Sequence, residues 1–147
     1  METPVNLIND TLEKVTVILD TAFPDYLTFE NCTFTIARGS TQVMIIIRPF
    51  NETDTCIECI SNVVIGAKIT NDLMRFLLRK NAELHFGAFG LLFDDTIIFS
   101  HSIAGANVDM NELVTTIHSV AIIADYYDDE IVRMAGGKRA IDVGNSD

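Results

Sequence analysis

The stretch NAELHFGAFGLLFDDTIIFSHSIAG, Asn81–Gly105, decides how this chain folds. Apolar and β-forming residues flank Asp94 and Asp95, and aspartates of this kind are typical of a turn. The pattern therefore predicts two strands, Glu83–Phe93 and Thr96–Ile103, that pair as an antiparallel hairpin. The rest of the chain can be placed around this hairpin, because helical patterns precede and follow it.

The register of the hairpin decides whether its two histidines can act together. If the turn holds two residues, Ala88 faces His101 and Phe86 faces Ile103. His85 then projects from the other face of the sheet, because side chains alternate along a strand. We therefore interpret both histidines as ordinary strand residues, on the condition that no one-residue bulge changes the register.

The other chemical motifs also favour structural roles. Gly87 and Gly90 lie within a predicted strand, whereas a phosphate cradle needs glycines in a loop between a strand and a helix. We expect a helix or a partner to pack over them. Cys56 and Cys59 are three apart in a strand and so lie on opposite faces, and Cys32 alone cannot complete a zinc site. The sequence thus predicts no catalytic residue, no metal site and no cofactor.

Two helical patterns precede the hairpin. In Thr70–Lys80, Leu73 and Leu77 share one side of a helix, and Met74 and Leu78 give it a second apolar edge. The first helix of the chain has its apolar stripe at Ile8, Leu12, Val15, Leu19 and Ala22.

A longer helix follows the hairpin. Asp109 is placed as its N-cap, and Glu112 has the spacing of a capping box. Gly136 and Gly137 predict its end. The side that should face the core is formed by Leu113, Ile117, Val120, Ala121, Ala124 and Ile131.

Three strands are predicted before the middle helix: Thr33–Arg38, Thr41–Arg48 and Thr53–Ile65. The order α-β-β-β-α-β-β-α predicts an α+β fold with a mostly antiparallel sheet packed by helices. Every residue of Val43–Ile47 is apolar, so this strand needs cover on both faces. One helical layer cannot supply both covers, and we infer that a second chain or another partner shelters part of the sheet.

Length and charge restrict the possible functions. The chain has 147 residues, which suits one domain, and we expect residues 1–137 to form it and residues 138–147 to be a disordered tail. The net charge of −11 argues against binding to nucleic acid or to anionic membranes. The acidic segment Asp125–Glu130 suits either a solvated helix end or a partner contact.

The sequence also predicts a compartment. No apolar run reaches the length of a membrane helix, and the amino-terminal METPVNLINDTLEK lacks the basic start and apolar block of a signal peptide. An odd number of cysteines, three, suits free thiols in a reducing environment. We therefore expect a soluble, cytoplasmic protein.

Two blocks of the sequence resemble the YbjN-like family, small bacterial proteins with the fold of the class I type III secretion chaperones. The first is Asn81–Gly90, with the run N-A-x-L-x-F-G-x-F-G. The second is Ala124–Asp128 at the end of the last helix, with A-D-x-Y-D. The likeness covers about Leu73–Met134, and the predicted order of elements extends it over nearly the whole chain.

The resemblance implies a chaperone-like module rather than an enzyme. The secretion chaperones bind unfolded segments of effector proteins as homodimers, and members of the YbjN-like group are also described as regulators. In that family the middle helix lies at the dimer interface, which assigns Met74 and Leu78 to the partner chain. The full set of predicted dimer- or partner-binding residues is Leu73, Met74, Leu77, Leu78, Phe86 and Phe89.

Two other hypotheses stay open at this point. One is a small-molecule-binding or catalytic domain with a pocket between sheet and helices, where His85 or His101 would converge with carboxylates. The other is a structural subunit of a larger assembly.

Overall fold

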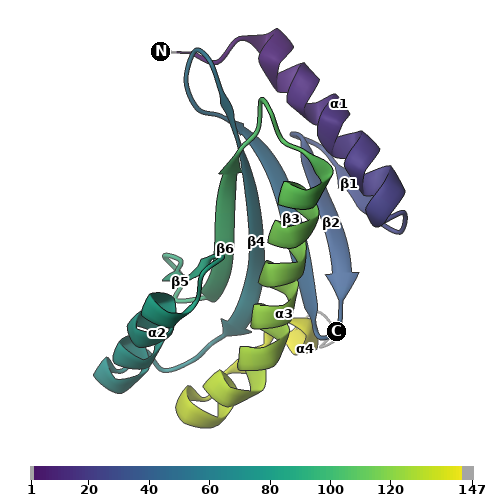
Figure 1. Ribbon diagram of the computed structural model, residues 1–147. Helices are drawn as coiled ribbons and strands as arrows, with labels where there is room; N and C mark the ends of the chain where they lie inside the picture. The colour runs from purple at the N-terminus through teal and green to yellow at the C-terminus, as the bar shows by residue number, and fades with distance from the viewer. Residues whose placement is uncertain (1, 144–147) are drawn as a thin grey trace.

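The protein is an antiparallel sheet with its two longest helices on one side (Figure 1). The computed structural model describes residues 2–143. The strand order is β1-β2-β3-β4-β6-β5, every pairing is antiparallel, and β7 pairs with β4. The predicted α+β fold is confirmed. The elements are α1 (Val5–Ala22), β1 (Leu27–Phe29), β2 (Thr33–Arg38), β3 (Thr41–Pro49), β4 (Thr55–Ile65), α2 (Asn71–Glu83), β5 (Ala88–Leu91), β6 (Ile97–Ala104), α3 (Met110–Ala135), β7 (Lys138–Arg139) and α4 (Ala140–Val143).

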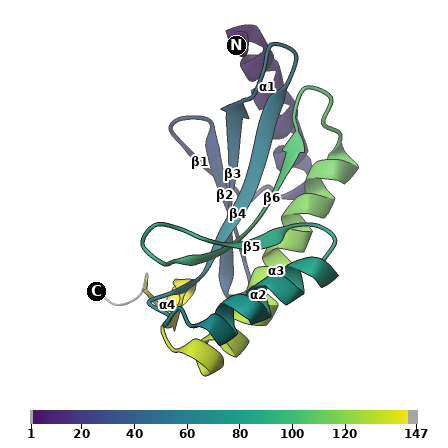
Figure 2. The ribbon, with the colours of Figure 1, turned by 90° about the vertical axis from the view of Figure 1, so that its left-hand side faces the viewer.

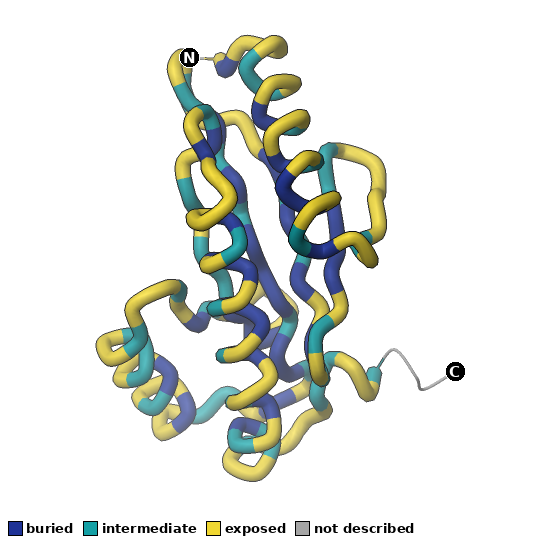
Figure 3. Tube along the Cα trace, turned by 45° about the vertical axis from the view of Figure 1, so that its right-hand side comes forward, coloured by how far each residue is buried: buried dark blue, intermediate teal, exposed yellow. Residues whose placement is uncertain are grey.

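Helix α3 crosses the sheet and supplies much of the core. Its predicted start is confirmed, because the Asp109 carboxylate accepts from the Glu112 backbone N–H at 2.8 Å and the Glu112 carboxylate accepts from the Asp109 N–H. It ends at Gly136, whose φ of +75° favours glycine. All six residues predicted to face the core are buried (Figure 3).

The two faces of the sheet differ in cover. Along β3, Val43, Ile45 and Ile47 are buried beneath α1 and α3, whereas Met44 and Ile46 point the other way and are only half-buried. We call the first side the covered face and the second the open face. Figure 2 shows α3 on one side of the sheet, with the open face turned away from it.

The predicted hairpin exists, but its register is shifted by one residue. Phe89 faces Phe99, and Ala88 faces Ser100 rather than His101. The turn holds three residues instead of two, because the Leu92 N–H bonds to the Thr96 carbonyl at 3.0 Å. Asp95 takes the left-handed conformation (φ +66°) that closes such a three-residue loop.

The segment predicted as a disordered tail is partly structured. Residues 138–143 form β7 and α4, and residues 144–147 lie outside the described residues. Strand β7 pairs with the end of β4, at Val64 and Ile65, so main-chain hydrogen bonds fix a segment whose composition looks like solvent-exposed tail. Strand β1 was also missed, because three residues are too few to show an alternating pattern.

Candidate functional site

The open face carries a row of side chains that crosses four strands, and three of its four members are apolar. Leu27 of β1 pairs with Thr35 of β2, Thr35 with Met44 of β3, and Met44 with Ile60 of β4. All four side chains lie on the open face, because partners in register share a face of the sheet. Leu27 is 57% exposed and Ile60 only 9%, so the row is most accessible at the β1 edge.

A second row adjoins the first and continues the apolar surface. Phe29 of β1 pairs with Thr33, and Thr33 with Ile46 of β3. Phe29 is 54% exposed and Ile46 is half-buried. Beyond Ile46 the row becomes charged, because Ile46 pairs with Glu58 of β4. The Glu58 carboxylate forms an ion pair with Arg48 at 3.3 Å. The open face is therefore apolar near β1 and more polar toward β4.

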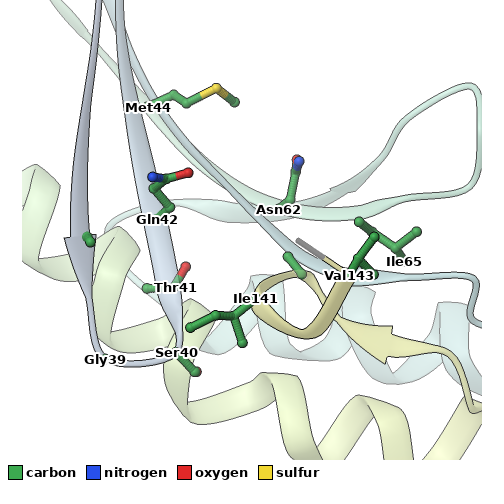
Figure 4. A pocket seen from close by; sticks show the side chains of 11 residues that line it. Gly39, Ser40, Thr41, Gln42, Met44, Asn62, Ile65, Ile141 and Val143 are labelled. Carbon is green, nitrogen blue, oxygen red and sulfur yellow. The ribbon is translucent and has the colours of Figure 1, made fainter. Parts of the chain in front are cut away.

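A hollow of about 370 Å³ lies at one end of the open face (Figure 4). Strands β2, β3 and β4 contribute its floor, which includes Met44 and Gln42, and Ile141 and Val143 of α4 stand over it. None of its lining residues within the described chain is a histidine, a cysteine or a charged residue. The hollow thus offers apolar contact and neutral polar groups.

The two edge strands of the sheet, β5 and β1, differ in whether their outer main-chain groups are hydrogen-bonded. At β5, the Asn81 amide donates to the Phe89 carbonyl at 3.1 Å and accepts from the Phe89 N–H at 2.7 Å, so the main chain there is already bonded. At β1, every residue is exposed, and no hydrogen bond among the described residues occupies the outer edge. Strand β1 is therefore the edge at which another strand can add.

The structure separates the six predicted partner-binding residues into two groups. Leu73, Leu77 and Phe89 are at most 9% exposed and belong to the core, so they support the fold and offer no surface to a partner. The reason is that α2 packs this side against β5 and α3. Met74, Leu78 and Phe86 are 41%, 69% and 52% exposed, and their role in dimerisation stays a prediction.

Histidines and cysteines do not form a reactive cluster. His85 is exposed, and His101 makes an edge contact with Phe86 at a ring-centroid distance of 6.1 Å. Cys56 lies on the open face and Cys59 on the covered face, where burial raises the pKa of its thiol to about 12. Among the described residues, no group of three or more potential metal ligands comes together.

The acidic end of α3 has a role that the sequence did not reveal. The Asp125 carboxylate accepts from both the backbone N–H (2.8 Å) and the hydroxyl of Ser40, and Asp128 also contacts that hydroxyl. These bonds lower the pKa of Asp125, while burial raises the pKa of Asp128. Two of the acids thus hold the β2–β3 turn, while Tyr126 and Asp129 of the same segment are exposed.

The structure shows what the two motifs shared with the YbjN-like family, Asn81–Gly90 and Ala124–Asp128, do in the fold. The Asn81 side chain joins β5 to α2 by hydrogen bonds. A Cβ atom on Gly87 would lie only 2.5 Å from the ring of Phe99, so a larger residue would clash there. Gly87 has a φ of +118° and precedes β5 rather than lying within it. Tyr127 packs edge-on against Phe89, with ring centroids 5.7 Å apart. Both motifs therefore build one corner of the fold around α2, β5 and α3.

Comparison with known proteins agrees with this architecture. The family model of type III secretion (YopN, CesT) and YbjN peptide-binding chaperones, TY-Chap1, matches residues 6–143. The chain belongs to the TY-Chap1 family. Its fold is similar to that of a chain in the crystal structure of the ExsC–ExsE complex, with a TM-score of 0.59, 14% sequence identity, and coverage of 89% of this chain and 97% of that chain. No curated protein matches the sequence significantly.

The chain is thus a member of a peptide-binding chaperone family with the secretion-chaperone fold, as the resemblance implied. Within the described residues, no helix has both the length and the apolar content to cross a bilayer. The sequence analysis did not predict Leu27 and Phe29 as site residues. Their signal is weak, since it consists only of the alternation L-T-F between Pro24 and the turn at Asn31.

Proposed function

We propose that this TY-Chap1 protein is a non-enzymatic chaperone that holds an extended polypeptide segment on the open face of its sheet. The observation that carries the proposal is the unoccupied outer edge of β1 beside the exposed Leu27 and Phe29. An added strand would gain main-chain hydrogen bonds at this edge, and alternate side chains would extend the two apolar rows. The family supports a peptide as the occupant.

The charge of the protein favours one kind of segment. With a net charge of −11, the surface attracts cationic residues and repels acidic ones. The two rows are short, since they reach from β1 to β3 or β4, and each contains one threonine in β2. A client therefore combines a few alternating apolar residues with flanking Lys or Arg.

The exposed edge of α2 supports a homodimer. Met74, Leu78 and Phe86 expose apolar surface on the outer side of α2 and before β5, away from β1. A second copy packed there would cover them and leave the β1 edge free for a client. Replacing Met74 and Leu78 together by Glu is expected to give a soluble monomer by light scattering at micromolar concentration; a dimer that survives both changes would place the interface elsewhere.

The three cysteines are unpaired, in agreement with a reducing compartment, and we place the protein in the cytoplasm on that basis.

A peptide array tests the proposed binding. Labelled protein is applied to immobilised 13-residue peptides of varied apolar and basic content, and the affinity of the best peptide is measured in solution by fluorescence anisotropy. Leu27→Asp should weaken binding at least tenfold, because it places a charge in the apolar row. Val17→Asp is the matched control, since Val17 is 63% exposed on α1 and Leu27 is 57% exposed. Retention of no peptide, or equal affinity of the Leu27 variant and the parent, would overturn the proposal.

A further inference from the structure

Residues 138–143, which we call the strap, already occupy one end of the open face. Helix α3 lies on the covered face, yet α4 lies on the opposite side of the sheet (Figure 2). There Ile141 and Val143 stand over the hollow beside Met44 (Figure 4). Met44 also belongs to the row that begins at Leu27, so the hollow that the strap borders and the proposed client surface share one lining residue.

The path of the strap is specified by the backbone. Gly136 and Gly137, with φ of +75° and +83°, turn the chain from α3 back toward β4. Gly137 approaches so closely that a Cβ there would lie 2.7 Å from both the Ala67 nitrogen and the Ile65 oxygen. The Lys68 N–H also bonds to the Ala135 carbonyl at 2.9 Å, which fixes the end of α3. The strap is therefore delivered to one place on the sheet.

The strap makes the same two kinds of contact that the proposed client would make. Its β7 part pairs its main chain with β4, Arg139 opposite Val64 and Lys138 opposite Ile65. Its α4 part places a branched aliphatic side chain, Ile141, against the open face. Its composition, two basic residues followed by Ala, Ile, Asp and Val, also combines basic and branched aliphatic residues as the charge argument assigns to a client.

The strap is held by a short ladder and by partly exposed side chains. Its ladder with β4 has two residue pairs, and Ile141 remains 40% exposed. Its ion pairs, Arg139 with Asp142 at 2.9 Å and with Asp129 at 3.8 Å, involve partly exposed side chains and so add little. A segment attached in this way can leave the sheet without disturbing the covered face.

We infer that the strap is an intramolecular occupant of the open face, and that it competes with the client for the hollow beside Met44. The inference rests on the proposed function. It adds a regulatory step and a chemical preference: the client must displace Ile141, and the residue that enters the hollow is a branched aliphatic one.

The test compares four full-length proteins with the best fluorescein-labelled peptide from the array. They are the parent, Ile141→Asp, Arg139→Pro and Ile122→Asp. The first variant places a charge in the hollow, and the second removes a main-chain donor and both ion pairs of Arg139. Ile122→Asp is the matched control, because Ile122 is an isoleucine of α3 with 64% exposure. Hydrogen exchange at the amides of the β4–β7 ladder, whose pairs are Val64 with Arg139 and Ile65 with Lys138, reports release of the strap.

The two strap variants should bind the peptide roughly tenfold more tightly than the parent, with faster exchange in the β4–β7 ladder, and the control should match the parent. If the strap variants exchange faster but bind no more tightly, the competition is wrong while the proposed function stands. If the control tightens as much as the strap variants, the effect is non-specific and the competition is again wrong. If none of the four proteins binds any peptide, the proposed function and the inference both fail.

Discussion

The covered and open faces of the sheet are made from the same strands, and they differ in how completely they are sealed. On β3, Val43 and Ile45 are 0% exposed, whereas their neighbours Met44 and Ile46 keep part of their surface in contact with solvent. The segment Val43–Ile47 is apolar on both faces, so within this segment apolar content alone does not decide which side the chain buries. What decides is the placement of α1 and α3, which both lie on one side.

The polar groups of the two faces show the same contrast. On the covered side, buried hydroxyls satisfy one another in pairs: Thr11 with Thr55 at 2.8 Å, and Thr41 with Ser61. On the open side, the buried hydroxyl of Thr35 has no hydrogen-bond partner in the described part of the chain. Among the buried hydroxyls of the sheet the two faces therefore differ, although one carboxylate oxygen of Asp128, on α3, also has no partner among the described residues.

The largest difference should appear when neighbouring isoleucines of β3 are shortened. Ile45→Ala is expected to lower the free energy of unfolding by about 2–5 kcal/mol, because it leaves a cavity in a fully buried site. Ile46→Ala on the open face should cost less than about 1 kcal/mol, because solvent already reaches that side chain. Urea denaturation of both variants measures the two values. Similar losses at the two positions would mean that the open face is sealed in solution, as by a tightly bound second copy.

The division into faces could be predicted from the sequence only in part. Periodicity located the three long helices, and the caps at Asp109 and Gly136 fixed the limits of α3, because these signals are local. The hairpin register was wrong because it depends on the conformation of Asp95, which composition does not determine. Helical periodicity also could not decide whether Leu73 or Met74 faces the core, since both edges of α2 are apolar.

The missed parts of the site depend on long-range contacts. Asp125 and Ser40 are 85 residues apart in the chain, and their bond follows from how α3 lies on the sheet. The strap has two basic residues and no pattern of its own, and it is ordered only because β4 offers it an edge at Val64 and Ile65. In both cases the tertiary structure supplies the partner, and no local signal announces it.

A smaller effect, on pH dependence, is expected at the acidic clamp on the covered side. Burial raises the pKa of Asp128 in the folded state, so protonation of this carboxyl group stabilises the fold. The stabilisation is fully present below about pH 4, which is the pKa in the unfolded state. It is lost as the pH rises through the pKa of the folded state. Asp128→Asn should therefore stabilise the protein by about 1 kcal/mol near neutral pH and flatten the pH dependence of unfolding above about pH 4.

Asp125 provides the opposite control on the same turn of helix. Hydrogen bonds from Ser40 lower its pKa, so its contribution is present above about pH 4 and is lost as pH falls through the folded pKa. Asp125→Asn should destabilise the protein at neutral pH. Thermal unfolding of the two variants from pH 3 to pH 8 measures both trends. Equal signs for the two variants at neutral pH would show that the carboxyl groups do not have opposite environments.

The smallest effect is expected from replacing single buried threonines on the two faces by valine. Thr35→Val removes a hydroxyl without a partner in the described structure and should stabilise the protein by a few tenths to about 1 kcal/mol. Thr41→Val is the matched change on the covered face, and it should destabilise by about 1 kcal/mol because it removes the buried hydrogen bond between the Thr41 and Ser61 hydroxyls. Urea midpoints of the two variants, compared with the parent, give the signs. Loss of stability in both would mean that Thr35 is also hydrogen-bonded in solution, to water or to a second chain, and that the open face is less unfinished than its hydroxyl indicates.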